Sequence, residues 1–347
     1  MSGLIRNIWD AANQEVMLTE KDGLKGAEKS CLFVGGKSSG KTTVMLKFLS
    51  REDSAKPTTA LEYTFARRAT NLQHKLTGHI WELGGGTNLR KLVDIPLTLD
   101  TLQRMTVLLF LDLSEPNKLW FTAETLLRAM RERLDVVLKT GNKQNPGFQQ
   151  LMNKAAWERI GGKDRNDANS INPFPVPLFI IGSKFDLYQD MDSDKKKVIT
   201  KCMRFLAHSN GATAMYVSSK VDTTMRGFKH IMNVSVFDGQ LNKSPIIDST
   251  RPLYIPCGMD SMDAIGKAPL ASSDIGRITS KNPSETWKIA FCGHFPQDGD
   301  VKQADIPDPA KDAQFREPKI DELRAQKDKE LEAYKRQESH KWADKIA

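Results

Sequence analysis

The chain has 347 residues, of which 39% are hydrophobic and 27% are charged, and its formal net charge is +8 at pH 7. This length allows a sizeable hydrophobic core, and the composition excludes a wholly disordered or collagen-like chain. No apolar run approaches the roughly 20 residues that span a bilayer, and the first residues lack the layout of a secretory signal. We therefore expect neither membrane insertion nor an export signal. The basic residues are dispersed without an arginine-rich arm, which argues against nucleic-acid binding.

The N-terminal part, residues 1–28, is predicted to contain a short helix packed on the body or on a partner, because apolar residues recur at helical spacing from Leu4 to Val16. Strands are predicted, in chain order, at 30–34, 63–69, 76–83, 107–113, 176–181 and 214–218. Helices are predicted at 42–49, 119–138, 198–207 and 225–236. Strands that alternate with helices predict a mostly parallel sheet with helices on both faces.

The rest of the chain departs from this alternation. Residues 140–177 are rich in Gly and Pro and are predicted to be an insertion with one helix near 148–159. Residues 298–347 hold 11 Lys and Arg and 13 Asp and Glu, and a helix is predicted at 321–346. The predicted parts are an N-terminal extension (1–28), a P-loop domain (29–240), a part packed on it (241–297) and a charged tail (298–347).

The cysteines and histidines give no sign of a metal site. The four cysteines are scattered without a CxxC pair, and the six histidines show no ligand spacing. We therefore expect reduced thiols, as in a cytosolic protein, and no zinc site.

The strongest motif follows the first predicted strand and opens the first predicted helix. Its sequence, GGKSSGKT from Gly35 to Thr42, matches the P-loop pattern G-x-x-x-x-G-K-[ST]. In such a loop the backbone N–H groups cradle phosphates, and the following helix N-terminus favours the negative charge. Lys41 is predicted to reach the β- and γ-phosphates and Thr42 to bind Mg²⁺. The alternative is a glycine-rich turn that binds nothing.

Four further segments stand in the order in which a small GTPase places its motifs. Residues 57–59 (PTT) offer Thr58 as a switch threonine, and residues 82–85 (ELGG) take the place of Asp-x-x-Gly. Residues 183–186 (SKFD) take the place of Asn/Thr-Lys-x-Asp, where Asp186 would recognise guanine, and residues 218–220 (SSK) resemble the element that supports the base. Together these segments predict a Ras-like GTPase-type fold.

The departures from the GTPase pattern indicate slow or absent hydrolysis. Glu82 replaces Asp, and Gly86 stands where Ras-like enzymes carry the glutamine that orients the attacking water. Ser183 is shorter than Asn and loses a carboxamide contact. We therefore predict no catalytic residue, although Arg67 and Arg68 lie near in the sequence.

The predicted ligand is GTP or GDP with Mg²⁺ in a structural role, with Thr42 and Thr58 as the metal ligands. The predicted nucleotide-binding residues are Gly35, Lys37, Ser38, Ser39, Gly40, Lys41, Thr42, Thr43, Thr58, Gly85, Ser183, Lys184, Asp186, Ser219 and Lys220.

Several longer segments resemble the dynein light intermediate chain family. They are PTTALEYTFARR (57–68), WELGGG (81–86), NPFPVP (172–177) and IIGSKFD (180–186), and the tail block QKDKELEAYKR (326–336) resembles the dynein 2 branch. The resemblance spans nearly the whole chain, and the WELGGG and NPFPVP blocks are its most specific parts.

The resemblance implies a non-catalytic accessory subunit of the cytoplasmic dynein 2 motor. Its expected partners are the dynein 2 heavy chain, whose tail it would stabilise, other dynein 2 subunits and, through the motor, intraflagellar transport particles. The implied role is retrograde intraflagellar transport and cilium assembly, in the cytoplasm, cytoskeleton and cilium, including the basal body and axoneme. An active regulatory GTPase with switch loops at 57–65 and 84–91 is the alternative. A P-loop ATPase or kinase is disfavoured, because Asp186 fits guanine.

Overall fold

The computed structural model describes residues 28–69, 75–237, 239, 241–248, 251–270, 282–298 and 317–346. The described residues up to Asp298 belong to one compact unit, and those from Glu317 onward belong to a second. The helix predicted between Leu4 and Val16 lies outside the described residues. The boundaries predicted after residues 28, 240 and 297 stay predictions.

The first unit is built on one mixed sheet. Its strands, in spatial order, are β2 (Leu61–Ala69), β3 (Lys75–Leu83), β1 (Lys29–Gly35), β4 (Met105–Asp112), β5 (Leu178–Ser183), β6 (Thr213–Tyr216) and β7 (Tyr254–Ile255). The five strands from β3 to β6 run parallel to one another, and β2 and β7 pair antiparallel at the two edges. This topology confirms the predicted Ras-like fold with a mostly parallel sheet.

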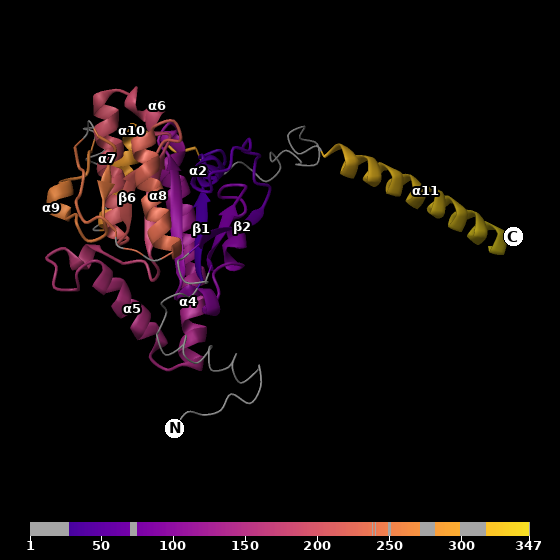
Figure 1. The fold of residues 1–347 in the computed structure, drawn as a ribbon, viewed down its shortest axis with the longest axis horizontal. Helices are drawn as coiled ribbons and strands as arrows, with labels where there is room; N and C mark the ends of the chain where they lie inside the picture. Colours follow the sequence, from indigo (N-terminus) through magenta and orange to yellow (C-terminus); the bar gives the residue numbers. More distant parts are fainter. Residues whose placement is uncertain are drawn as a thin grey trace. The chain divides into compact units, whose positions relative to one another are not determined.

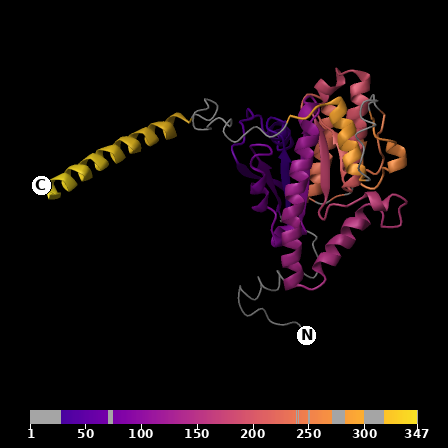
Figure 2. The same cartoon turned by 180° about the vertical axis from the view of Figure 1, so that it is seen from behind.

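Helices cover both faces of the sheet. Helices α2 (Lys41–Phe48) and α8 (Asp222–Phe237) pack on the face seen in Figure 1. Helices α4 (Pro116–Gln144), α7 (Ser193–Ser209) and α10 (Pro283–His294) pack on the opposite face, seen in Figure 2. Helix α5 (Phe148–Arg159) packs against α4. The remaining short elements are η1 (Arg90–Asp94), α3 (Leu99–Leu102), η2 (Ala168–Ser170), α6 (Phe185–Gln189) and α9 (Met262–Ile265).

The central strands are buried because both of their faces meet helices. In β1, Cys31 and Phe33 belong to the apolar cluster under α2 and α8, whereas Leu32 and Val34 belong to the cluster under α4, α7 and α10. Strand β4 is buried from Met105 to Leu111. A strand covered on both faces has no polar alternation, which explains its continuous apolar sequence.

Several elements differ from the prediction, which had no helix at α10 (Pro283–His294) and none of the short helices α3, α6 and α9. Helix α4 continues to Gln144, so the segment predicted as an insertion from residue 140 begins inside a helix. Gly141 is buried there, and a Cβ on it would lie 2.6 Å from a ring carbon of Phe148. The glycine that suggested a break therefore allows α5 to pack closely on α4. Strand β7 was also not predicted, because two residues at a sheet edge leave no periodic pattern.

The second unit contains helix α11 (Pro318–Ile346), which confirms the predicted tail helix. Its apolar residues Leu323, Leu331 and Tyr334 are each at least half exposed. Such sparse apolar residues form no continuous stripe, so this helix gains little from burial within its own unit. Among the described residues, no helix is long and apolar enough to span a membrane.

A buried polar network ties α7 to the segment before α9. Arg204 of α7 makes a two-pronged salt bridge with Asp260, with N···O distances of 2.8 and 2.6 Å. Beside it, Asp167 accepts hydrogen bonds from Nε2 of His208 at 2.7 Å, from the backbone N–H of Met262 at 3.1 Å and from Arg165 at 3.1 Å. Burial raises the pKa of Asp167, but these hydrogen bonds outweigh it and lower the pKa from 3.8 to about 2.

The low pKa of Asp167 predicts that the free energy of unfolding falls as this carboxylate becomes protonated at acidic pH. A carboxylate whose pKa is lowered on folding stabilises the fold above its unfolded pKa, and this contribution is lost as the pH falls toward the folded pKa. The shift from 3.8 to about 2 corresponds to about 2 kcal/mol. We expect Asp167→Asn to lower the free energy of unfolding by about that amount at pH 7. Urea titrations should show the difference from wild type shrinking between about pH 4 and pH 2. A constant difference across that range would contradict the assignment.

Candidate nucleotide-binding site

The predicted motifs gather at one edge of the sheet. The P-loop follows β1, Glu82 lies at the end of β3, Asp112 ends β4, Ser183 ends β5, and Ser218 follows β6. These five strands are parallel, so their carboxyl ends lie along the same edge. In open α/β sheets this edge is where ligands bind.

The P-loop connects β1 to α2 and is closed by Lys41. The Nζ atom of Lys41 donates to the carbonyl oxygens of Gly35 at 3.2 Å and Gly36 at 2.8 Å, and lies 3.5 Å from Oγ of Ser39. Ser38 has a left-handed backbone with a φ of 59°, and Gly40 precedes α2 with a φ of 83°. Ser39 is buried, whereas Lys37 and Ser38 are exposed. The loop therefore wraps around the Lys41 ammonium group at a helix N-terminus, where anions are favoured.

The two predicted metal ligands lie together. Oγ1 of Thr42 and Oγ1 of Thr58 are 3.5 Å apart, although 16 positions separate them in the sequence. Thr42 also donates its hydroxyl hydrogen to Oε1 of Glu82 at 2.7 Å. The backbone N–H of Gly84 donates to the carbonyl oxygen of Ala60 at 2.6 Å, which holds the loop of Thr58 against the end of β3.

Glu82 carries an unpaired oxygen in this corner. It is only 2% exposed, and its Oε2 atom is buried without a hydrogen-bond partner. Burial raises the pKa of Glu82, and the Thr42 hydrogen bond and the nearby Lys41 oppose that shift. Burial lowers the pKa of Lys41 to about 8, and Glu82 opposes this shift as well. Lys41 and Glu82 are thus buried groups of opposite charge. A bound phosphate would give Lys41 a charged partner, and a bound cation would give one to Glu82.

The position of the hydrolytic glutamine is filled by Gly86 in a conformation that disfavours a side chain. Its φ is 62°, and a Cβ there would lie 3.0 Å from the backbone nitrogen of Lys37. Gly86 therefore packs against the P-loop backbone. Neighbouring Gly85, a predicted nucleotide-binding residue, is half-buried on the same loop.

The predicted guanine-binding residues also come together. Oδ1 of Asp186 accepts the Ser218 hydroxyl at 2.6 Å, and its Oδ2 accepts Nζ of Lys220 at 3.0 Å. Burial raises the pKa of Asp186, but the Ser218 and Lys220 hydrogen bonds outweigh it, so the pKa lies below its ordinary value. Asp186 is therefore an ionised double acceptor, as recognition of two guanine N–H groups requires.

Two residues in this part of the site differ from simple expectation. Ser183 is buried and donates its hydroxyl hydrogen to the carbonyl oxygen of Leu111 at 3.2 Å. Its side chain therefore links the end of β5 to β4. Lys184 pairs with Asp112 at 2.5 Å. The prediction did not include Asp112, although an acidic residue at the carboxyl end of a parallel strand is itself a signal.

Lys47 of α2 was also not predicted. It donates to the carbonyl oxygen of Ser219, which joins α2 to the loop after β6. Thr43 lies half-buried in the first turn of α2. The structure thus groups the predicted residues at a phosphate end, around Lys41, and a base end, around Asp186.

The residues present fit a nucleotide with a divalent cation. The orphaned Glu82 oxygen and the paired hydroxyls of Thr42 and Thr58 are oxygen donors of the kind that Mg²⁺ prefers. Among the described residues, no group of three His, Cys, Asp or Glu side chains could hold a metal. A cation here would accordingly depend on phosphate oxygens as further ligands.

The fold and this edge define a Ras-like P-loop protein of the GTPase type. The dynein light intermediate chain family model matches residues 5–171. The chain is 43% identical to cytoplasmic dynein 2 light intermediate chain 1 of Danio rerio over 96% of both chains. It is 43% identical to the Homo sapiens protein of the same name, over 96% of this chain and 97% of that one. This chain therefore belongs to the dynein light intermediate chain family.

A solved structure supports the same fold. The crystal structure of the conserved domain of the dynein light intermediate chain matches with a TM-score of 0.55 at 17% identity. It covers 78% of this chain and 98% of that domain. The predicted family is confirmed, while the individual nucleotide contacts stay predictions.

Proposed function

We propose that this chain is a non-catalytic subunit of the cytoplasmic dynein 2 motor, which binds and stabilises the heavy-chain tail. The observation that carries the proposal is the 43% identity over 96% of both chains to a cytoplasmic dynein 2 light intermediate chain. Similarity along the whole length includes the body and the tail, not the P-loop alone. Through the motor, the chain would serve retrograde intraflagellar transport and cilium assembly, and would be found in the cytoplasm, cytoskeleton and cilium.

The P-loop edge supports a structural role for a bound guanine nucleotide. In this proposal Lys41 and the P-loop N–H groups hold phosphates, Asp186 holds the base, and Thr42, Thr58 and Glu82 face Mg²⁺. The cation, when bound, would neutralise phosphate charge. A ligand that binds only the folded chain would add about 2.7 kcal/mol of stability at a 100-fold excess over its Kd.

The alternative, an active regulatory switch, is favoured by one contact. The 3.5 Å approach of Thr42 and Thr58 is what a switch threonine needs in order to respond to a bound nucleotide. A switch requires different partner affinities with GDP and GTP. Equal heavy-chain binding in the two nucleotides would reject it.

The test uses the full chain, epitope-tagged and expressed in ciliated cells that lack the endogenous protein. We expect the dynein 2 heavy chain to co-purify with it in a fixed ratio, and return traffic from the ciliary tip to be restored. Denaturing the purified chain and separating the supernatant by chromatography identifies any bound nucleotide. Normal ciliary return traffic in cells without the chain, or no association with the heavy chain, would reject the proposal.

Restoring the missing glutamine is expected not to create a GTPase. Gly86→Gln places a Cβ 3.0 Å from the Lys37 nitrogen at a φ of 62°, so the new side chain is strained before it can orient water. We expect single-turnover hydrolysis of radiolabelled GTP to change by less than about threefold, against the about 10⁵-fold that complete GTPase machinery supplies. Gly86→Ala controls for the strain, because it adds the Cβ without the carboxamide. A rise well above both wild type and this control would show that only the glutamine was missing.

A further inference from the structure

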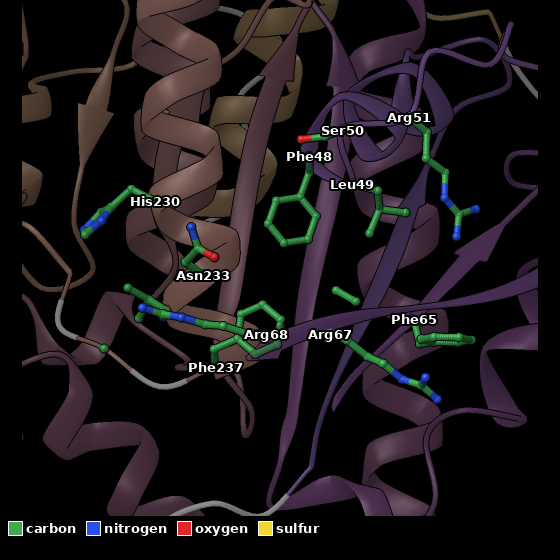
Figure 3. Close-up of a pocket in the computed structure, with 13 residues that line it drawn as sticks. Phe48, Leu49, Ser50, Arg51, Phe65, Arg67, Arg68, His230, Asn233 and Phe237 are labelled. Carbon is green, nitrogen blue, oxygen red and sulfur yellow. The ribbon is translucent and has the colours of Figure 1, made fainter. Parts of the chain in front are cut away.

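An aromatic face lies at the β2 edge of the sheet, on the side that also carries α4. In the antiparallel ladder of β2 and β3, directly opposite residues point to the same side, and the pairs that form this face are Tyr63 with Trp81 and Phe65 with His79. Trp81 packs against the apolar cluster under α4, which identifies the side. In Figure 3 Arg68 extends toward α8, whereas Phe65 points away from it.

The described helices leave this aromatic face open. Helix α4 packs on β1 and β4, and η1 packs on β3. Tyr63 remains 48% exposed and Phe65 remains 39% exposed. The ring centroids of Tyr63 and Trp81 are 4.9 Å apart, and the guanidinium group of Arg67 lies 4.7 Å over the Phe65 ring. Contiguous apolar surface marks an interaction site, whereas single exposed rings need no explanation.

The chain enters the described fold beside this face. Glu28 precedes β1, and its Oε2 atom lies 2.9 Å from Nε2 of His79. The other ring nitrogen of His79, Nδ1, lies 2.7 Å from the Tyr63 hydroxyl. Glu28 is thus joined to the aromatic face through one histidine side chain. The residues that precede Glu28 therefore approach the sheet next to the uncovered rings.

The N-terminal segment carries a matching apolar stripe. Between residues 4 and 16, apolar side chains recur at helical spacing, with Ile8 and Trp9 at the centre of the stripe. A helix over 4–16 would be about 20 Å long. The part of β2 from 61 to 67 extends over about 23 Å, so such a helix could lie along it. Residues 17–27 can span about 36 Å when extended, so the connection to Glu28 does not prevent this placement.

We propose that residues 4–16 form an amphipathic helix that packs its apolar stripe on the aromatic face. A helix of this length is marginal in water by itself and gains stability by burying an apolar side. Its covalent connection through Glu28 gives it a high effective concentration at the face, which a second copy or a partner protein would have to exceed. In the isolated chain the helix would therefore keep other proteins from these rings. The inference does not depend on the nucleotide or on the heavy chain.

Photo-crosslinking in the full chain tests the placement. The photoreactive residue p-benzoylphenylalanine replaces Phe65, the dilute protein is irradiated, and mass spectrometry identifies the joined peptides. We expect a product with the mass of one chain, in which position 65 is joined to a residue between 4 and 16. The control places the same probe at Met259, which is 46% exposed and follows β7 at the opposite edge of the sheet, and it should give no such product. A product with the mass of two chains, or no crosslink to residues 4–16, would overturn the proposal.

Two matched variants separate packing from chance encounter. Ile8→Asp/Trp9→Asp places two charges in the apolar stripe and should lower the crosslink yield at least about tenfold, because burying an unpaired carboxylate is unfavourable. Asn7→Asp/Asn13→Asp adds the same two charges on the opposite side of the predicted helix and should leave the yield within about twofold, since exposed substitutions have small effects. Equal losses in the two variants, or full yield in both, would contradict packing of this stripe on the aromatic face.

Discussion

Lys41→Ala is expected to lower the affinity for guanine nucleotide by about 100-fold or more, so that the purified chain retains almost none. A hydrogen bond to a charged group contributes about 1.5–3 kcal/mol, and the predicted role of Lys41 is to make more than one to the phosphates. The fold should persist, because burial already lowers the pKa of this ammonium to about 8 and its removal relieves that desolvation. Release of bound nucleotide by denaturation, quantified by chromatography, measures the effect.

The control for Lys41→Ala comes from the same loop. Lys37 is exposed, so Lys37→Ala removes an equal charge from the P-loop without removing a buried contact. It should lower nucleotide content by less than about threefold, the size of a screened surface interaction. Equal losses in the two variants would mean that Lys41 acts only through the net charge of the loop.

The same pair of variants tests whether a bound nucleotide stabilises the domain and whether assembly with the heavy chain needs it. If the nucleotide stabilises the domain, Lys41→Ala should lower the unfolding temperature, and addition of nucleotide should stabilise only wild type and Lys37→Ala. If heavy-chain association survives in Lys41→Ala, the nucleotide is dispensable for assembly. The proposed subunit role would then stand while the proposed structural ligand would not.

The fold was largely predictable because its strands are buried on both faces. A continuous apolar run such as that of β4 has few other stable locations in a chain with alternating helices. The edge strand β7 was not predictable, since two residues carry no period. Its partner strand β6 comes from a distant part of the sequence, with Ala214 opposite Ile255, 41 positions later, and only tertiary packing brings the two together. The end of α4 was missed because Gly141 was interpreted as a break, although it serves close helix packing.

The site was predictable as motifs but not as contacts. The P-loop follows directly after a predicted strand, and Thr58 and Asp186 were predicted because their segments stand in the order of GTPase motifs along the chain. The partners of Lys184 and Lys47 could not be predicted, because Asp112 and the Ser219 carbonyl are far from them in the sequence and come close only in the folded chain.

The largest stability effect is expected from breaking the buried pair of Arg204 and Asp260. Both side chains are less than a tenth exposed, and their two hydrogen bonds measure 2.8 and 2.6 Å. Removing one partner leaves the other charge buried, which costs about 3–5 kcal/mol. We expect Asp260→Ala and Arg204→Met each to lower the free energy of unfolding by about that amount in urea titrations.

The double variant distinguishes a lost contact from a stranded charge. In Arg204→Met/Asp260→Ala no buried charge remains, so the loss should be smaller than that of either single variant. The exposed pair of Lys197 and Asp194, 3.0 Å apart, supplies the control, and Lys197→Ala should cost less than about 1 kcal/mol. A double variant as unstable as the sum of the singles would contradict the interpretation.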